Sequence, residues 1–82
     1  MNRYPALIRQ EPDTTYGVGF PDFPGCVAGG ETFEEALVMA EEALALHVFE
    51  LRQDSIPVPP PSDVEPESGS SLVFVPLLVP QF

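Results

Sequence analysis

The sequence is poor in positive charge. Three arginines and no lysine stand against 13 acidic residues in a chain of 82, which gives a formal net charge of −10 at pH 7. Contacts to the phosphates of DNA or RNA need Lys and Arg side chains, so this composition argues against an independent nucleic-acid binder. A protein with this charge instead suits a basic partner, because opposite charges accelerate association.

Cysteine and long apolar runs are equally scarce. Cys26 is the single cysteine, so no disulfide can form within the chain, and a reducing cytoplasm is the expected location. Residues 1–17 contain no long apolar run and no small-residue cleavage site, which argues against a signal peptide. No apolar stretch approaches the roughly 18 residues that a membrane-spanning helix needs.

What remains is enough for one small folded domain over residues 1–82. Hydrophobic residues make up 44% of the sequence and include six Phe and two Tyr, which is too many for a disordered acidic tail. A chain of this size builds one compact core rather than two.

Four segments have the composition of β-strands, at about residues 4–9, 15–20, 26–29 and 72–79. Residues 15–20 alternate, with large side chains on one face and Gly17 and Gly19 on the other. The glycine face is flat, so another backbone or side chain can approach it closely. The last segment is apolar throughout, and the proline within it predicts a sheet edge or a bulge.

A helix is predicted at about residues 33–54. Thr32 is a good N-cap, and Glu35 three residues later completes a capping box. Apolar residues then recur in steps of three and four, at Phe33, Leu37, Ala40, Leu44, Val48 and Leu51. Pro57 stops the helix, and residues 57–71 read as a proline-rich, then acidic, extended link.

The order of these elements, β-β-β-α-β, predicts an α+β fold of two layers. The first strands pair as an antiparallel hairpin, and the helix crosses one face of the sheet. We expect the last strand to return parallel to the first and beside it, which gives the sheet order 3-2-1-4.

The acids concentrate on the predicted helix. Residues 31–54 hold seven acids and one arginine, a net charge of −6. On a helical wheel, five glutamates lie opposite the apolar stripe, at positions 31, 34, 35, 41 and 42. A solvated helix face explains this pattern, and so does a landing surface for a basic partner. Val38 and Phe49 fall among these acids, and exposed apolar side chains there would favour the partner surface. Alternatively, the link folds back and covers Phe49.

The sequence offers little for catalysis or metal binding. His47 is the single histidine and borders the apolar stripe, where a structural role is expected. Cys26 begins a strand and is expected to be a small buried side chain. No zinc-binding spacing of Cys and His is present, and the loop acids Asp13, Asp22 and Glu31 are too scattered for a magnesium site. We therefore predict no catalytic residue, no metal site and no cofactor, so the protein is not an enzyme.

Residues 16–26, YGVGFPDFPGC, contain a Tyr-x-Val-x-Phe strand that runs into a Pro-Asp-x-Pro-Gly-Cys turn. This segment resembles the motif of the HicB-like antitoxins of bacterial toxin–antitoxin pairs, with Phe23 where that family usually has Leu. Three further stretches resemble the family's first strand, its helix start and its proline-rich segment: residues 4–6, 30–44 and 57–62. The last strand resembles the family more loosely.

The resemblance implies a partial ribonuclease-H-like fold and an antitoxin function. HicB-like domains bind HicA-type toxins, small basic ribonucleases with a catalytic histidine, and cover their active site. An acidic chain that meets a basic toxin agrees with the charge of this sequence. The carboxylates of an active ribonuclease H are not evident here, and kinship of fold does not give activity. Most members carry a C-terminal DNA-binding domain, whereas this sequence ends after its last strand, so DNA binding by this chain is not expected.

For the toxin we predict contacts from the acidic helix start, the turn before it and one helix residue: Asp22, Phe23, Glu31, Glu34 and Phe49. Two other functions remain open at this point. One is an orphan oligomeric domain without a toxin. The other, with less support, is a metal-dependent nuclease.

The apolar last strand also predicts self-association. One helix covers one face of the sheet, so every second residue of 72–79 stays exposed on the other. The exposed set is either Val73, Val75 and Leu77 or Leu72, Phe74 and Leu78. Burial of each such side chain contributes roughly 1.5–3 kcal/mol. We expect a two-fold homodimer through this strand and the sheet face away from the helix, with the interface residues Val73, Phe74, Val75 and Leu77.

Overall fold

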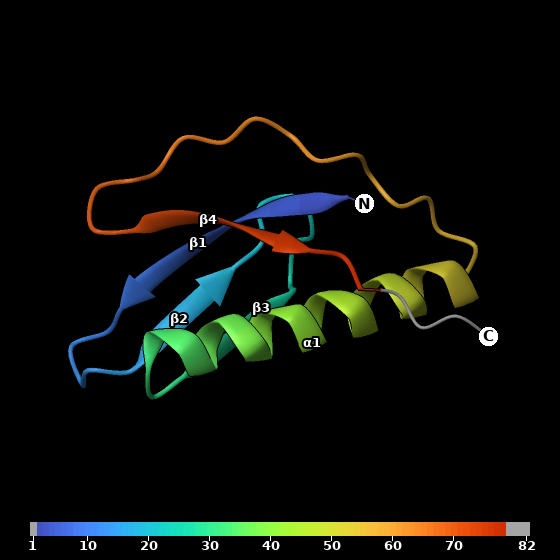
Figure 1. The fold of residues 1–82 in the computed structure, drawn as a ribbon. Coiled ribbons are helices and arrows are strands. Elements are labelled where there is room, and N and C mark those ends of the chain that lie inside the picture. The colour runs from blue at the N-terminus through green and yellow to red at the C-terminus, as the bar shows by residue number, and fades with distance from the viewer. Residues whose placement is uncertain (1, 79–82) are drawn as a thin grey trace.

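The computed structural model describes residues 2–78 and places a four-stranded antiparallel sheet against one helix (Figure 1). The elements follow in the order β1 (Arg3–Gln10), β2 (Tyr16–Gly19), β3 (Val27–Gly30), α1 (Phe33–Gln53) and β4 (Ser71–Pro76). The strands lie in the order β3-β2-β1-β4. The predicted α+β fold, sheet order and single helix are therefore confirmed. Val79, the last residue of the predicted final strand, lies outside the described residues.

The core lies between α1 and the sheet face that carries the even-numbered residues of β1. Tyr4, Ala6 and Ile8 are each at most 3% exposed. The helix contributes four residues that are 0% exposed: Ala36, Ala40, Leu44 and Val48. Three of them belong to the predicted apolar stripe, whereas its first member, Phe33, is 36% exposed and packs edge-on against Tyr16.

Local sequence sets both ends of α1. At the start, the Thr32 hydroxyl accepts a hydrogen bond from the Glu35 backbone N–H, and the Glu35 carboxylate accepts one from the Glu31 N–H, both at 3.0 Å. The predicted capping box thus forms, although its carboxylate binds the N–H before the cap rather than that of the cap itself. At the other end, Asp54 is the C-cap and Ser55 adopts a left-handed φ of 56°. Backbone hydrogen bonds typical of a Schellman turn close the helix there.

β3 and α1 approach each other closely at Gly30. A Cβ atom there would lie 2.6 Å from the backbone nitrogen of Ala36 and 2.9 Å from the carbonyl carbon of Glu35. No side chain fits into that space unless the helix moves, so Gly30 allows the chain to turn directly from β3 into α1. This short connection places the acids of the first helical turn at the end of β3.

β4 pairs with β1 in the antiparallel direction, with Arg3 opposite Pro76 and Ile8 opposite Ser71. The prediction of a parallel last strand is therefore wrong. α1 spans about 30 Å and brings the chain to the end of the sheet where β1 begins. Residues 57–70, which we call the link, span about 40 Å when extended and carry the chain back before β4 starts (Figure 1). The chain thus crosses the length of the sheet twice between β3 and β4, once in α1 and once in the link. The second crossing makes β4 run antiparallel to β1.

Polar contacts fasten the link to the rest of the domain at three points along its length: Tyr4–Pro59, Asp22–Ser62 and Arg9–Glu67. The first contact belongs to a buried tyrosine, and the second combines two hydrogen bonds on one carboxylate. The third is an ion pair between two exposed side chains, and such pairs contribute little to stability. The first two contacts therefore fix the path of the link.

Candidate partner-binding surfaces

The turn between β2 and β3 buries its aromatic residue. The Phe23 N–H donates to the Phe20 carbonyl at 3.0 Å, and the Cys26 N–H donates to the Phe23 carbonyl at 2.9 Å, which folds the turn inward. Phe23 is 2% exposed, and its ring packs edge-on against Tyr4 and His47, with centroid distances of 4.8 and 5.6 Å. The assignment of Phe23 as a partner contact is therefore corrected, because this side chain belongs to the core.

Asp22, next to it, binds the link. Its carboxylate accepts a hydrogen bond from the Ser62 backbone N–H at 3.1 Å and another from the Ser62 hydroxyl. The pKa of Tyr4 is raised above its ordinary value, first by burial and then by the Asp22 carboxylate, while Arg52 lowers it. Asp22 is half-buried and acts within the domain, so its contact with a partner stays a prediction.

The acids of the helix start lie apart from that turn. Glu31 and Glu34 are exposed at the N-terminal end of α1, where negative charge complements the helix dipole. β3 is four residues long and separates them from the Asp22 turn by about 13 Å. The predicted contact residues thus divide between the two ends of β3 and do not form one continuous cluster.

The side of α1 that faces away from the sheet carries apolar side chains among acids. Val38 is 52% exposed and Leu46 is 59% exposed, while Phe49 is half-buried. A helix turns by about 100° per residue, which puts these residues and the exposed Glu42 on one side, opposite the core positions. We call Val38, Glu42, Leu46 and Phe49 the outer helix face. It was predicted in part, since Val38 and Phe49 fall among the acids of the sequence.

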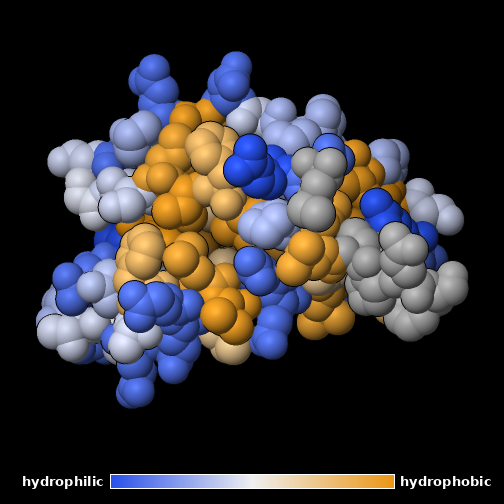
Figure 2. All heavy atoms as spheres, viewed as in Figure 1, coloured by the Kyte–Doolittle hydropathy of each residue, from blue (hydrophilic) through white to orange (hydrophobic). Residues whose placement is uncertain are grey.

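β4 divides the predicted oligomer residues between the two faces of the sheet. Val75 is 2% exposed, and Val73 and Leu77 are partly buried against the core. Alternation along the strand turns these odd-numbered residues toward α1. The assignment of the buried Val75 as an interface residue is therefore corrected, while Val73 and Leu77, which are half-buried, stay predictions. Phe74 points to the opposite face and is 58% exposed. Figure 2 shows apolar side chains gathered over β4 and over the first half of α1.

Cys26 is buried, as predicted, and His47 is half-buried with its ring against Phe23. The Cys26 thiol is 4% exposed and donates to the Ala43 carbonyl oxygen at 3.6 Å. Burial raises the pKa of this thiol, which disfavours the reactive thiolate. Among residues 2–78, no group of three His, Cys, Asp or Glu side chains is placed to hold a metal ion.

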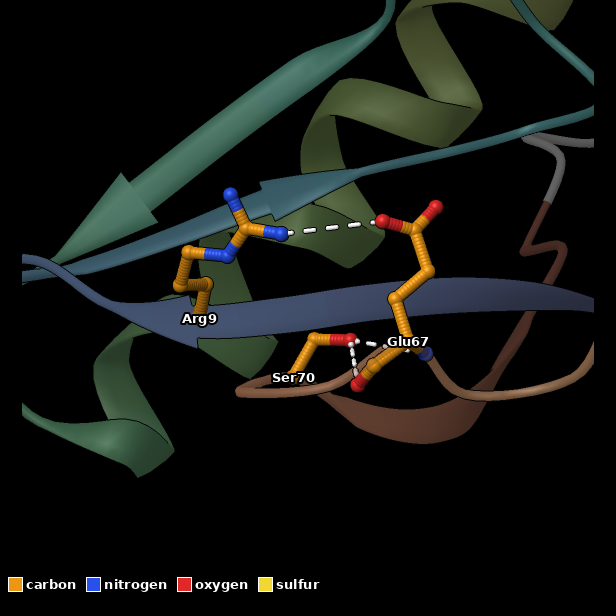
Figure 3. A network of polar contacts seen from close by, with 3 residues as sticks. All are labelled: Arg9, Glu67 and Ser70. Carbon is orange, nitrogen blue, oxygen red and sulfur yellow. Dashed lines mark hydrogen bonds and ion pairs between the residues drawn. The ribbon is translucent and has the colours of Figure 1, made fainter.

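The sheet face opposite α1 carries a shallow groove with a volume of about 400 Å³. We call it the open-face groove, and its lining includes Leu7, Gly17, Gly19, Val27 and Glu67. Arg9 rises from β1 beside it, and its guanidinium lies 3.7 Å from the Glu67 carboxylate of the link (Figure 3). The alternation of residues 15–20 predicted the flat glycine floor. The alternation did not predict that the link contributes Glu67 to the groove, because Glu67 is far from β2 in the sequence.

The sequence of residues 4–71 matches the family described as HicB_like antitoxin of bacterial toxin-antitoxin system. The chain belongs to the HicB-like antitoxin family. The match confirms the resemblance that rests on residues 16–26 and extends it through the link to the first residue of β4.

Several relatives of this HicB-like chain are named antitoxins. Antitoxin HicB 2 of Photorhabdus laumondii is 38% identical over 74 residues, which cover 90% of this chain and 50% of that protein. Antitoxin HicB of Escherichia coli K12 is 34% identical over 77 residues, which cover 94% of this chain and 54% of that protein. The HicB-like chain thus spans about half the length of the curated relatives it matches.

Solved structures agree with the fold. A chain of the HicA3 and HicB3 toxin-antitoxin complex superposes with a TM-score of 0.74 and 34% identity, covering 90% of this chain and 95% of that chain. The Burkholderia pseudomallei antitoxin HicB superposes with a TM-score of 0.80 and 29% identity, covering 93% of this chain and 63% of that chain. The arrangement of β1–β4 and α1 is therefore that of HicB antitoxins.

Proposed function

We propose that this HicB-like chain binds a small basic HicA-type toxin and neutralises it by covering its active site. The observation that carries the proposal is the likeness to a chain of the HicA3 and HicB3 complex, at 34% identity over 90% of this chain. The net charge of −10 supports a basic partner, because complementary charge speeds encounter and suppresses wrong partners.

The toxin-binding surface that we propose is α1, from its acidic start along the outer helix face. Residues 31–54 carry a net charge of −6, which would steer a basic toxin toward the helix. Val38 and Leu46 are the exposed apolar residues of this face. Their burial in a complex would contribute about 25 cal/mol per Å² of apolar surface. Glu31 and Glu34 would act mainly on the association rate.

We further infer that the chain acts by binding alone, without catalysis, a cofactor or direct nucleic-acid contact, in the cytoplasm. The nuclease alternative requires carboxylates that converge on a metal ion, and residues 2–78 bring no such group of three together. The helix of the described part is not long and apolar enough to cross a membrane.

We also propose a two-fold homodimer formed through β4 and the open face of the sheet. Phe74 and Leu78 are 58% and 47% exposed, and exposed apolar side chains of this size mark interaction surfaces when they lie together. An orphan oligomeric domain would form the same dimer without a toxin.

A binding and cleavage experiment separates the antitoxin from the orphan domain. The purified chain is titrated with a small basic HicA-type toxin, and mRNA cleavage by that toxin is followed in parallel. We expect tight binding and suppressed cleavage. Reversal of Glu31 and Glu34 to Lys should slow association on the order of ten-fold at low salt, whereas reversal of the exposed link acids Asp63 and Glu65, a matched change in charge, should have a smaller effect. No binding at low salt would contradict the antitoxin proposal.

A further inference from the structure

We propose that the open-face groove of one copy receives the Phe74 side chain of a second copy, so that two identical aromatic contacts hold the dimer. This inference rests on the homodimer proposed above and names the residues that would form it. It does not depend on a toxin.

The groove is open space above the β2 backbone. A Cβ atom at Gly19 would have no heavy atom of the described residues within 4 Å, and one at Gly17 would meet only the flexible Glu11 carboxylate, at 3.0 Å. A second hollow of about 350 Å³ continues from the first and shares with it Leu7, Gly19 and Val27. Val27 at the rim is 70% exposed. The lining combines the apolar Leu7, Ala28 and Val27 with the polar Arg9, Glu11, Glu67 and Ser70. A hollow of this size accommodates an aromatic ring over its glycine and apolar floor and would release water when filled.

Phe74 lies on the same face as the groove. It stands opposite Pro5 of β1, and Leu7, two residues further along β1, lines the groove. A protruding ring and a hollow side by side on one face are self-complementary under a two-fold axis that lies between two such faces. Each Phe74 then enters the groove of the other copy. An aromatic side chain buries about 150–250 Å², and aromatic residues in central pockets dominate interface energies.

Charge favours a second copy as the occupant. On the open face Arg9 is paired with Glu67. Glu11 also lines the groove, and Arg3 shares that side of β1, so two acids face two arginines there. The strong negative charge of residues 31–54 lies on α1, on the side of the sheet opposite the open face. Charges separated by more than about 8 Å are largely screened at physiological salt. Two open faces can therefore meet without strong repulsion, whereas a basic protein is attracted to α1 instead.

The experiment measures the oligomeric state of the full chain by sedimentation equilibrium. We expect a dimer at high micromolar concentration. Gly19→Val adds a side chain to the groove at a position where its Cβ meets no heavy atom of the described residues within 4 Å, and Phe74→Lys removes the ring. Each should weaken dimerisation about ten-fold or more. Val38→Lys, at an exposed residue of the outer helix face, is the control and should leave the dimer intact. Circular dichroism shows that each variant folds.

Mixing the two variants makes the decisive measurement. In a heterodimer of Gly19→Val with Phe74→Lys, one groove is filled and faces the lysine, while the other groove is intact and faces an intact Phe74. We expect this mixture to form a heterodimer that is tighter than either variant alone. A native chain that stays monomeric overturns both the groove contact and the homodimer. A native dimer that Gly19→Val does not weaken, or a mixture that does not recover association, overturns the groove contact and leaves the homodimer standing.

Discussion

The Tyr4 hydroxyl donates a hydrogen bond of 2.6 Å to the Pro59 carbonyl oxygen, across 55 positions of sequence. Tyr4 is 1% exposed, and its ring also packs against Phe23 of the β2–β3 turn. One side chain thus joins β1, that turn and the link. Because the path of the link determines the direction in which β4 enters the sheet, this contact helps to fix the antiparallel pairing of β4 with β1.

Removal of the hydroxyl should therefore weaken the domain. We expect Tyr4→Phe to lower the free energy of unfolding by about 0.5–1.5 kcal/mol, since the ring stays in place and one hydrogen bond is lost. Urea unfolding followed by circular dichroism measures this change. Tyr16→Phe, at a half-buried ring that packs on Phe33, is the control, and an equal loss there would contradict the role given to the Tyr4 contact.

The same tyrosine should make the domain sensitive to alkali. Burial and Asp22 raise the pKa of Tyr4 above its ordinary value of 10.0, so the folded chain holds this proton more tightly than the unfolded chain does. This contribution to stability is complete below the unfolded pKa and is lost as the pH rises through the folded value. The free energy of unfolding, measured upward from about pH 9, should fall more steeply for the native chain than for Tyr4→Phe. Parallel curves would show that Tyr4 is not the group responsible.

Phe23 should behave as a core residue and not as a surface contact. Phe23→Ala should lower the free energy of unfolding by about 3–5 kcal/mol, because it leaves a cavity beside Tyr4 and His47. Phe23→Leu keeps most of the volume and should cost less than about 1.5 kcal/mol. Thermal unfolding of the two variants distinguishes these cases. Nearly unchanged stability in Phe23→Ala would restore the original prediction of a surface role.

Asp22 should hold the link in place. Asp22→Ala removes the acceptor of both Ser62 hydrogen bonds, so the link should open more often and be cut about ten-fold faster by a protease that cleaves after glutamate, at the bond between Glu67 and Ser68. Asp63→Ala loses the same charge from an exposed position of the link and is the matched control. Equal cleavage rates in the two variants would mean that the Asp22 contact does not restrain the link.

The strands, the helix and their order could be predicted because each depends on a local pattern. Residues 15–20 alternate with a period of two, and the apolar stripe from Phe33 follows the helical period. The direction of β4 has no such signal, since a parallel and an antiparallel return bury the same side chains. It depends on contacts between residues far apart in the sequence, such as Asp22 and Ser62.

The candidate surfaces also include features that a local pattern predicts and features that depend on distant contacts. Acids opposite an apolar stripe predicted the outer helix face, because both patterns lie within one helix. The prolines and glycine of the β2–β3 turn predicted its shape, but not that Phe23 turns inward, which depends on space left between Tyr4 and His47. Alternation predicted that one side of β4 would be exposed, but it did not determine which side. The pairing with β1 places Val75 in the core and Phe74 on the open face.

The pairing of Arg3 with Pro76 also sets the time at which this protein can fold. β1 lies inside the sheet, yet one of its two neighbours is β4, which follows the other described strands by about 40 residues of sequence. Until β4 has left the ribosome, β1 presents an unpaired edge and the core lacks Val75. Contacts between such distant residues also slow folding relative to local ones. The sheet therefore stays incomplete until residues 71–76 have emerged, and the core closes only when β4 joins it.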